Sequence, residues 1–314
     1  MEELNVLFLG GGKRVSLAEY FINKGKDKGF KVNIYSYELT NQVPISSVAE
    51  VIVGLKWDDN SILDHLSNIV KDNKIKIILS FVDQAIEIAS KLKEKVKHTF
   101  IPCCNQNMCQ IMYDKKMAYE WFNINNIPTP KTFNQITNHF PYILKPRKGS
   151  ASKGIVILYN KEELKKINDI HAYVIQEYIS NKTEYTVDCY VSSNNDIISI
   201  VPRVRLEVAG GEVVNTLTCR NERIIELSKI ILQTGNFKGP ITIQFIKNND
   251  INELYVMEIN PRLGGGVIAS IEAGADVVSF IIEDYMGLPL VYMDQWQENL
   301  LMTRYFKEVF FICK

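Results

Sequence analysis

The chain has 314 residues and no formal net charge, because 36 lysines and arginines balance 36 aspartates and glutamates. Its 46% hydrophobic and 23% charged residues are typical of a globular protein with a large core, and the balanced charge argues against a nucleic-acid partner. No apolar run approaches the ~20 residues of a membrane helix, no leader-like segment follows Met1, and the six cysteines lack paired spacing, so we expect a cytoplasmic protein without a membrane partner.

Strands and helices alternate through the first hundred residues. Each expected strand is short and apolar, and each expected helix repeats apolar residues at helical spacing. The expected strands span 5–9, 31–37, 51–54, 75–81 and 99–101, and the expected helices span 14–28, 61–71 and 84–95. This alternation predicts an α/β domain with an open parallel sheet and helices packed against it.

The pattern changes after Pro102. A helix expected at 107–124 ends in a turn around Pro128 and Pro130, and most of the following elements are expected to be strands. The expected strands span 142–145, 155–158, 173–178, 185–191, 197–201, 213–217, 241–246 and 254–260, with helices at 223–235 and 267–286 and a tail at 301–312. Successive strands with few helices between them predict an α+β second part.

The segment 258–262, which reads Glu-Ile-Asn-Pro-Arg, follows the strand-like run 254–257. Because alternate side chains on a strand share a face, Glu258 and Asn260 point the same way. A carboxylate and an amide oxygen suit Mg²⁺, and an arginine two residues later suits a phosphate or a carboxylate. The segment therefore predicts a metal site beside an anion-binding arginine.

Gln244 lies on the preceding expected strand, which a short polar loop joins to the metal-site strand. If the two strands pair as a hairpin, Gln244 lies opposite Glu258, and three oxygen ligands converge. Taken alone, Gln244 also fits a polar hairpin edge that faces solvent. Mg²⁺ takes few protein ligands and completes its shell with phosphate oxygens and water, so this site predicts a nucleotide substrate.

A basic loop rich in small residues connects two further expected strands. Lys145 ends the first strand, and residues 146–154 read Pro-Arg-Lys-Gly-Ser-Ala-Ser-Lys-Gly. Glycine and serine let backbone N–H groups approach phosphate oxygens, and the lysines supply positive charge. Such a loop can close over a nucleotide and exclude water, although an ordinary exposed turn is the alternative. It is not a Walker A loop, because the G-x-x-x-x-G-K-[ST] pattern is absent.

Two weaker patterns concern the nucleoside and the substrate. The run 174–179 can line an adenine and Glu184 can accept hydrogen bonds from ribose hydroxyls, although a plain strand and turn explains both. Arg203 and Arg205 share a strand face and can fork onto a carboxylate, or they form a solvated surface pair.

Taken in order, these features resemble the ATP-grasp superfamily across residues 107–290, in particular its carbamoyl-phosphate-synthase-like branch of carboxylate–amine ligases. The resemblance implies that ATP lies between two lobes, with Mg²⁺, or Mn²⁺ in its place, held by Gln244, Glu258 and Asn260. Because Gln244 stands where many relatives have a second acid, the number of metal ions that bind, one or two, stays open. The residues that the resemblance assigns to the nucleotide are Lys115, Lys145, Lys148, Ser150, Ser152, Gly154, Gln176, Glu177, Ile179, Glu184 and Gln244.

The resemblance also implies a reaction. A carboxylate would take the γ-phosphoryl group of ATP to form an acyl phosphate, and an amine would then displace phosphate. The alternatives are phosphorylation of bicarbonate or carbamate within the same fold, and a nucleotide-binding protein without ligase activity. The expected partners are a small-molecule carboxylate and amine, with a homodimer as a plausible assembly. The expected catalytic residues are Lys145, Arg203, Arg205 and Arg262.

Three domains are expected: an α/β domain at 1–112, the small lobe of the ATP-grasp module at 113–178, and its C-terminal lobe at 179–314. The turn at 10–15 lacks the last glycine of a dinucleotide fingerprint, so we favour a tight turn near the substrate over NAD binding. Asp83 ends another expected strand, where it either lines the substrate pocket or caps a helix.

Overall fold

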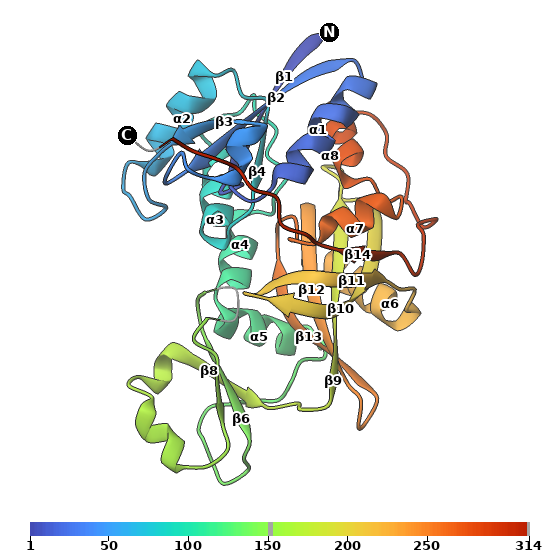
Figure 1. Cartoon of the computed structure of the whole chain (residues 1–314). Helices are drawn as coiled ribbons and strands as arrows, with labels where there is room; N and C mark the ends of the chain where they lie inside the picture. The colour runs from blue at the N-terminus through green and yellow to red at the C-terminus, as the bar shows by residue number, and fades with distance from the viewer. Residues whose placement is uncertain (150–152, 313–314) are drawn as a thin grey trace.

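The structure, a computed structural model, describes residues 1–149 and 153–312. Three β-sheets follow one another along the chain; helices connect the first to the second, and residues 178–181 connect the second to the third (Figure 1). Ser150 and Ser152, which the resemblance assigns to the phosphate loop, lie outside the described residues. Within the described part, no helix is both long enough and apolar enough to cross a membrane.

The first sheet is parallel and has the strand order β3-β2-β1-β4. The carboxyl ends of parallel strands meet at one edge of a sheet, and at this edge Gly10, Glu38 and Asp83 line a common cavity. The strands are β1 (Glu2–Leu9), β2 (Phe30–Glu38), β3 (Glu50–Val53) and β4 (Ile77–Ser80), and the helices are α1 (Val15–Asp27), η1 (Pro44–Ser47), α2 (Ile62–Asp72) and α3 (Asp83–Leu92).

Two helices, α4 (Gln106–Tyr113) and α5 (Lys115–Ile124), lead into a small antiparallel sheet with the order β5-β8-β6-β7. This sheet lies at the lower end of the molecule in Figure 1. Lys145 on β6 pairs with Val174 on β8. Gln176 lies two residues after Val174 on the same strand, where it pairs with Ile143 of β6. The elements are β5 (Thr132–Phe133), β6 (Tyr142–Pro146), β7 (Val156–Leu158), η2 (Glu162–Lys166), η3 (Ile170–Ala172) and β8 (Tyr173–Glu177).

The third sheet is antiparallel and has the order β13-β12-β9-β10-β11-β14. The segment after β14, dark red in Figure 1, extends back toward the N-terminal part of the molecule. The elements are β9 (Lys182–Val191), β10 (Ile197–Ala209), β11 (Glu212–Thr218), α6 (Glu222–Thr234), β12 (Gly239–Asn248), β13 (Glu253–Asn260), α7 (Val267–Glu272), α8 (Val277–Tyr285) and β14 (Leu301–Thr303).

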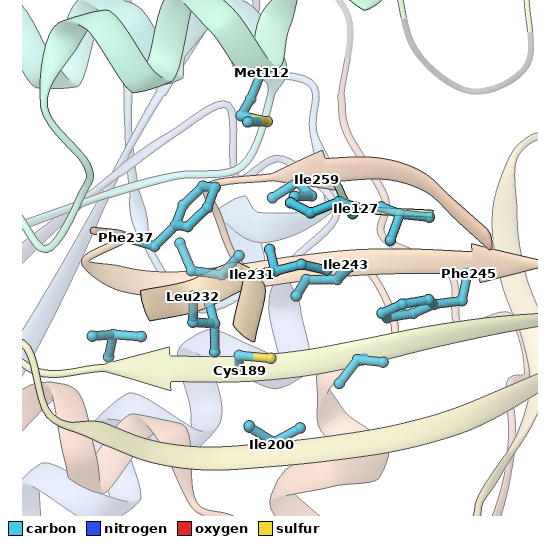
Figure 2. Packing of buried hydrophobic residues seen from close by; sticks show 14 of the residues in the cluster. Met112, Ile127, Cys189, Ile200, Ile231, Leu232, Phe237, Ile243, Phe245 and Ile259 are labelled. Carbon is cyan, nitrogen blue, oxygen red and sulfur yellow. The ribbon is translucent and has the colours of Figure 1, made fainter. Parts of the chain in front are cut away.

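The largest hydrophobic core joins α4, α6 and the third sheet. Figure 2 shows Leu232 of α6 and the nearby Phe237 gathered beside Ile243 of β12 and Ile259 of β13. Met112 of α4 belongs to the same buried cluster. Burial of these side chains away from water therefore fixes α4 against β13, the strand that carries the predicted metal ligands.

The predicted fold class is confirmed, because a parallel α/β sheet precedes two antiparallel sheets. The three sheets fall within the three ranges predicted for domains, while the domain boundaries themselves stay a prediction.

Two long helices were wrongly predicted as continuous. The first breaks at Asp114, whose extended backbone and side-chain bond to the Lys116 N–H begin a new helix. The second breaks near Gly274, whose φ of 108° does not fit a helix. The strand predicted at 99–101 reduces to one bridge, between Phe100 and Ile77.

Candidate active site

Lys145 is buried at the junction of the second and third sheets, with 4% of its surface exposed. Its ammonium group donates to Gln176 Oε1 at 2.9 Å and to the Tyr119 hydroxyl at 3.3 Å, and it lies 3.6 Å from Met257 Sδ. Burial lowers the pKa of Lys145 to about 7, although the carboxylate of Glu258 acts in the opposite direction. The site therefore holds a cation that its surroundings only partly neutralise, and an anionic ligand would complete it.

The predicted adenine-binding residues flank this lysine. Gln176 is fully buried and fixes Lys145, since its amide also donates to the Pro130 carbonyl at 3.2 Å. The Glu177 carboxylate accepts from the backbone N–H of Lys131 at 2.7 Å. Ile179 is buried. Adenine binding by these residues stays a prediction. The side chain of Gln176 positions Lys145 through its hydrogen bond to the ammonium group.

The predicted metal-binding strands pair in the expected register. Gln244 on β12 lies opposite Glu258 on β13, and Thr242 lies opposite Asn260. Asn260 Nδ2 donates to Glu258 Oε1 at 2.7 Å, which orients both oxygen-bearing side chains. Among the described residues, the side chain of Gln244 has no hydrogen-bond partner. Its role as a ligand, with those of Glu258 and Asn260, stays a prediction.

The described part of the basic loop is attached to α5. Lys115 Nζ donates to the Gly149 carbonyl at 2.9 Å, and both residues line one small gap together with Glu258 and Asn260. Lys148 is exposed and lies 5.7 Å from the centre of the Tyr113 ring. The structure thus brings Lys115 and the start of the loop beside the predicted metal ligands. Gly154, at the far end of the loop, is exposed and has a φ of 75°.

An ion pair that the sequence did not reveal anchors this loop. Arg147 donates to Asp114 through Nη2 at 2.6 Å and Nε at 3.2 Å. Burial disfavours the charged form of Asp114, yet the hydrogen bonds from Arg147 and from the backbone of Lys116 hold its pKa below the usual range. The break between α4 and α5 therefore also fixes one end of the loop.

An open cavity of about 600 Å³ lies between the first and third sheets. The carboxyl edge of the first sheet, the segment after β13 and the start of β11 provide its walls. The lining includes eight charged side chains: Lys13, Arg14, Glu38, Asp83, Arg203, Arg205, Glu212 and Arg262.

Arg205 faces this cavity with an incompletely paired guanidinium. Its Nε is buried without a hydrogen-bond partner among the described residues, and a Glu184 carboxylate oxygen lies 3.5 Å away. Burial lowers the pKa of Arg205, although Glu184 acts in the opposite direction. Glu184, the predicted ribose ligand, also pairs with Lys182 at 3.3 Å. Arg205 is therefore well placed to bind an anion that enters the cavity.

Arg203 lines the same cavity but is already paired. It is 1% exposed, and its Nε donates to Asp188 at 2.8 Å while Nη2 donates to the second carboxylate oxygen at 3.3 Å. Ser270 donates to the same carboxylate at 2.7 Å. The two arginines do not form a matched fork, and a catalytic role for Arg203 stays a prediction.

We expect Arg203→Met to lower the free energy of unfolding by about 3–5 kcal/mol, because it leaves Asp188 buried without its partner. Arg223→Met is the matched control, since it breaks an exposed pair with Glu253 and should cost at most about 1 kcal/mol. Urea unfolding of both variants measures the difference. Equal losses would contradict this assignment.

Arg262 joins the predicted metal strand to the first sheet. Its Nε donates to Asp83 at 2.7 Å. Asp83 is the first residue of α3, and its carboxylate lines the cavity and accepts from Arg262; the N-cap residue of that helix is Val82. This contact fixes the arginine at the edge of the cavity, where its predicted role is to bind the transferring phosphate.

Glu212 connects three segments that lie far apart in the sequence. Arg14 pairs with it at 2.9 Å, and Arg304, just after β14, pairs with it at 3.0 Å. Burial disfavours the charged form of Glu212, yet the two arginines lower its pKa to about 2. Arg304 also donates to the Gly265 carbonyl, which fastens the glycine segment after β13.

Sequence reasoning missed several of these contacts. Tyr119 lies four residues after Lys115 on the same helix, so helical spacing would have placed the two side chains on one face. Arg304 in the tail carried no signal of its own. Cys103, Cys104 and Cys109 are buried, and Cys109 lines the same small gap as Glu258 and Asn260. No three described His, Cys, Asp or Glu side chains are arranged to hold a metal.

Known proteins resemble both halves of the chain. Residues 169–307 match the family described as "ATP-grasp in the biosynthetic pathway with Ter operon", and residues 6–104 match "PylC-like, N-terminal domain". The D-alanine–D-alanine ligase of Petrotoga mobilis is 30% identical over 220 residues, which cover 59% of this chain and 72% of that protein. The chain belongs to the ATP-grasp superfamily.

Two further known proteins are similar to this ATP-grasp chain over most of its length. The carbamoyl phosphate synthase large chain of Clostridium botulinum is 28% identical over 258 residues, or 72% of this chain and 23% of that protein. The biotin carboxylase domain of Hydrogenobacter thermophilus 2-oxoglutarate carboxylase, solved as a dimer with MgADP, ADP and bicarbonate, superposes with a TM-score of 0.74. It is 16% identical and covers 95% of this chain and 73% of that chain, so it shows the shared fold.

These relatives confirm the predicted superfamily, its carbamoyl-phosphate-synthase-like branch and the prediction of an ATP-dependent ligase at the level of the family.

Proposed function

We propose that this ATP-grasp chain joins a carboxylic acid to an amine and releases ADP and phosphate. The observation that carries the proposal is the buried Lys145, whose pKa burial lowers to about 7 and whose charge interacts with Glu258, together with an open cavity lined by Arg205 and Arg262. A desolvated cation of this kind suits a phosphate group, and the arginines suit the acid that phosphate is transferred to.

The side chains fit the nucleotide and the metal that the fold implies. Lys115 and Lys145 would hold phosphate oxygens, and Gln244, Glu258 and Asn260 offer the hard oxygen donors that Mg²⁺ prefers. Mg²⁺ would supply neutralisation of the charge that builds up on the transferring phosphoryl group. Mn²⁺ accepts the same donors, so the proposal includes it as a substitute.

The reaction needs two displacements. A carboxylate oxygen of the acid attacks the γ-phosphorus and ADP leaves, which gives an acyl phosphate. The amine nitrogen then attacks the acyl carbon, phosphate leaves, and the nitrogen loses a proton. Arg205 and Arg262 would orient the acid, while the loop that begins at Arg147 would exclude water from the acyl phosphate.

The test is phosphate release from Mg-ATP over a panel of small carboxylates and amines, offered singly and in pairs, with Lys145→Ala as the blank. We expect release that requires one acid and rises with one amine. Release with bicarbonate alone would support carbamoyl-phosphate-type chemistry instead. ATP binding without release across the panel would support a nucleotide-binding protein.

The proposal also includes the division into 1–112, 113–178 and 179–314 and a homodimer. Analytical ultracentrifugation tests the dimer, and a sedimentation coefficient of a 36.0 kDa monomer across the working concentrations would exclude it.

A further inference from the structure

Glu38 lies at the carboxyl end of β2 and lines the large cavity opposite the predicted metal strands. Its Oε1 accepts from the Ser36 hydroxyl at 2.6 Å, and the nearby backbone N–H groups of Gly11 and Gly12 favour the charged form of the carboxylate. A Cβ atom on Gly12 would lie 3.1 Å from Glu38 Oε2. The glycine turn after β1 therefore leaves room for this carboxylate and holds it in place.

Among the described residues, Glu38 is the cavity acid that no arginine or lysine neutralises. Asp83 pairs with Arg262, and Glu212 pairs with Arg14 and Arg304. Burial raises the pKa of Glu38, and the groups that oppose this rise are all neutral donors. A half-buried carboxylate in an open cavity, without a counter-charge from the described residues, can pair with a positive group of a ligand that enters the cavity.

The opposite wall of the same cavity carries the complementary charge. Arg205 and Arg262 both line this wall, and each contacts a single carboxylate through its Nε: Glu184 at 3.5 Å from Arg205 and Asp83 at 2.7 Å from Arg262. An acid that is to be phosphorylated must place its carboxylate on this side. Any positive group that the same molecule carries would then extend toward the first sheet.

We propose that Glu38 binds the ammonium group of an amino-acid substrate whose carboxylate is the one activated. The inference rests on the proposed function and adds the class of acid and the residue that selects it. Glu38 acts in binding, through a charge-assisted hydrogen bond, and takes no part in either displacement. The ammonium group supplies the counter-charge that Glu38 lacks.

Hydroxylamine can test this without knowledge of the natural amine. Its nitrogen attacks the acyl phosphate, phosphate leaves, and the hydroxamate that forms is measured by its colour with ferric iron. We would offer Mg-ATP and hydroxylamine with the D- and L-amino acids, and compare each acid with its N-acetyl and des-amino analogues. Glu38→Gln keeps the shape and the bond from Ser36, and Glu94→Gln, at an exposed position, is the matched control.

We expect hydroxamate from one or a few free amino acids and none from their N-acetyl or des-amino analogues. For the same acid, Glu38→Gln should raise KM about 10- to 100-fold with little change in kcat or in ATP affinity, which is the scale of one charge-assisted hydrogen bond. Glu94→Gln should behave as the wild-type protein.

Two results would overturn the inference and leave the proposed function intact: equal activity with des-amino acids, or an unchanged KM in Glu38→Gln. Hydroxamate from none of the acids, together with normal ADP binding, would count against the proposed function and against this inference with it.

Discussion

Glu258→Gln should lower Mg²⁺-dependent turnover by about three orders of magnitude, the scale on which a preorganised charge-stabilising group contributes at a reacting centre. Glutamine keeps the shape of the side chain and can still accept the bond from Asn260 Nδ2, so the local structure should persist. It removes the negative charge that would hold Mg²⁺ between β12 and β13. Phosphate release measured against Mg²⁺ concentration gives the result.

Glu253→Gln provides the control for this substitution. Glu253 lies on the same strand but pairs with Arg223 at the surface, so its loss should leave turnover within about twofold. Circular dichroism of both variants checks that the fold is kept. Near-wild-type turnover in Glu258→Gln would remove this residue from the metal site.

Lys145→Met should weaken ATP binding at least about 100-fold, because a phosphate group would then be buried without its partner. Methionine resembles the lysine stem in length and removes only the ammonium group. Lys31→Met is the control, because Lys31 forms an exposed pair with Glu3 on the first sheet and should leave ATP binding nearly unchanged. Calorimetry with ATP or ADP measures both dissociation constants, and equal values for Lys145→Met and the wild type would contradict the assigned role.

The lowered pKa of Lys145 makes binding depend on pH. In the free protein the group loses its proton as the pH rises through about 7. Phosphate oxygens favour the charged form, so ATP raises this pKa on binding. About one pH unit above the pKa of Lys145 in the free protein, ATP binding should therefore be accompanied by uptake of a proton. The affinity for ATP should fall as the pH rises further. Calorimetry in buffers of different ionisation enthalpy detects this uptake, which Lys145→Met should abolish.

The metal strands could be predicted because they depend on local rules. Side-chain alternation put Glu258 and Asn260 on one face, and the short loop between the strands set the pairing that places Gln244 opposite Glu258. The basic loop after Lys145 was likewise recognisable from its composition. Predictions of this kind need no knowledge of how distant segments pack.

The contacts that orient the site could not be predicted, because they join segments far apart in the chain. Arg203 was expected to share a substrate with Arg205, but the adjoining strand β9 brings Asp188 to its guanidinium. Side-chain alternation predicts which face of a strand a residue occupies. It does not predict which residue of the neighbouring strand lies beside that side chain. Arg304 reaches Glu212 only because β14 pairs with β11.

The most direct test of the account follows the oxygen atoms of the acid. A pool of amino acids and simple carboxylates, with ¹⁸O in their carboxyl groups, would be incubated with the protein, Mg-ATP and hydroxylamine. If an acyl phosphate forms, one labelled oxygen passes from the acid to phosphate, and mass spectrometry should find inorganic phosphate with a single ¹⁸O. Turnover that releases only unlabelled phosphate would contradict the ligase mechanism proposed for this site.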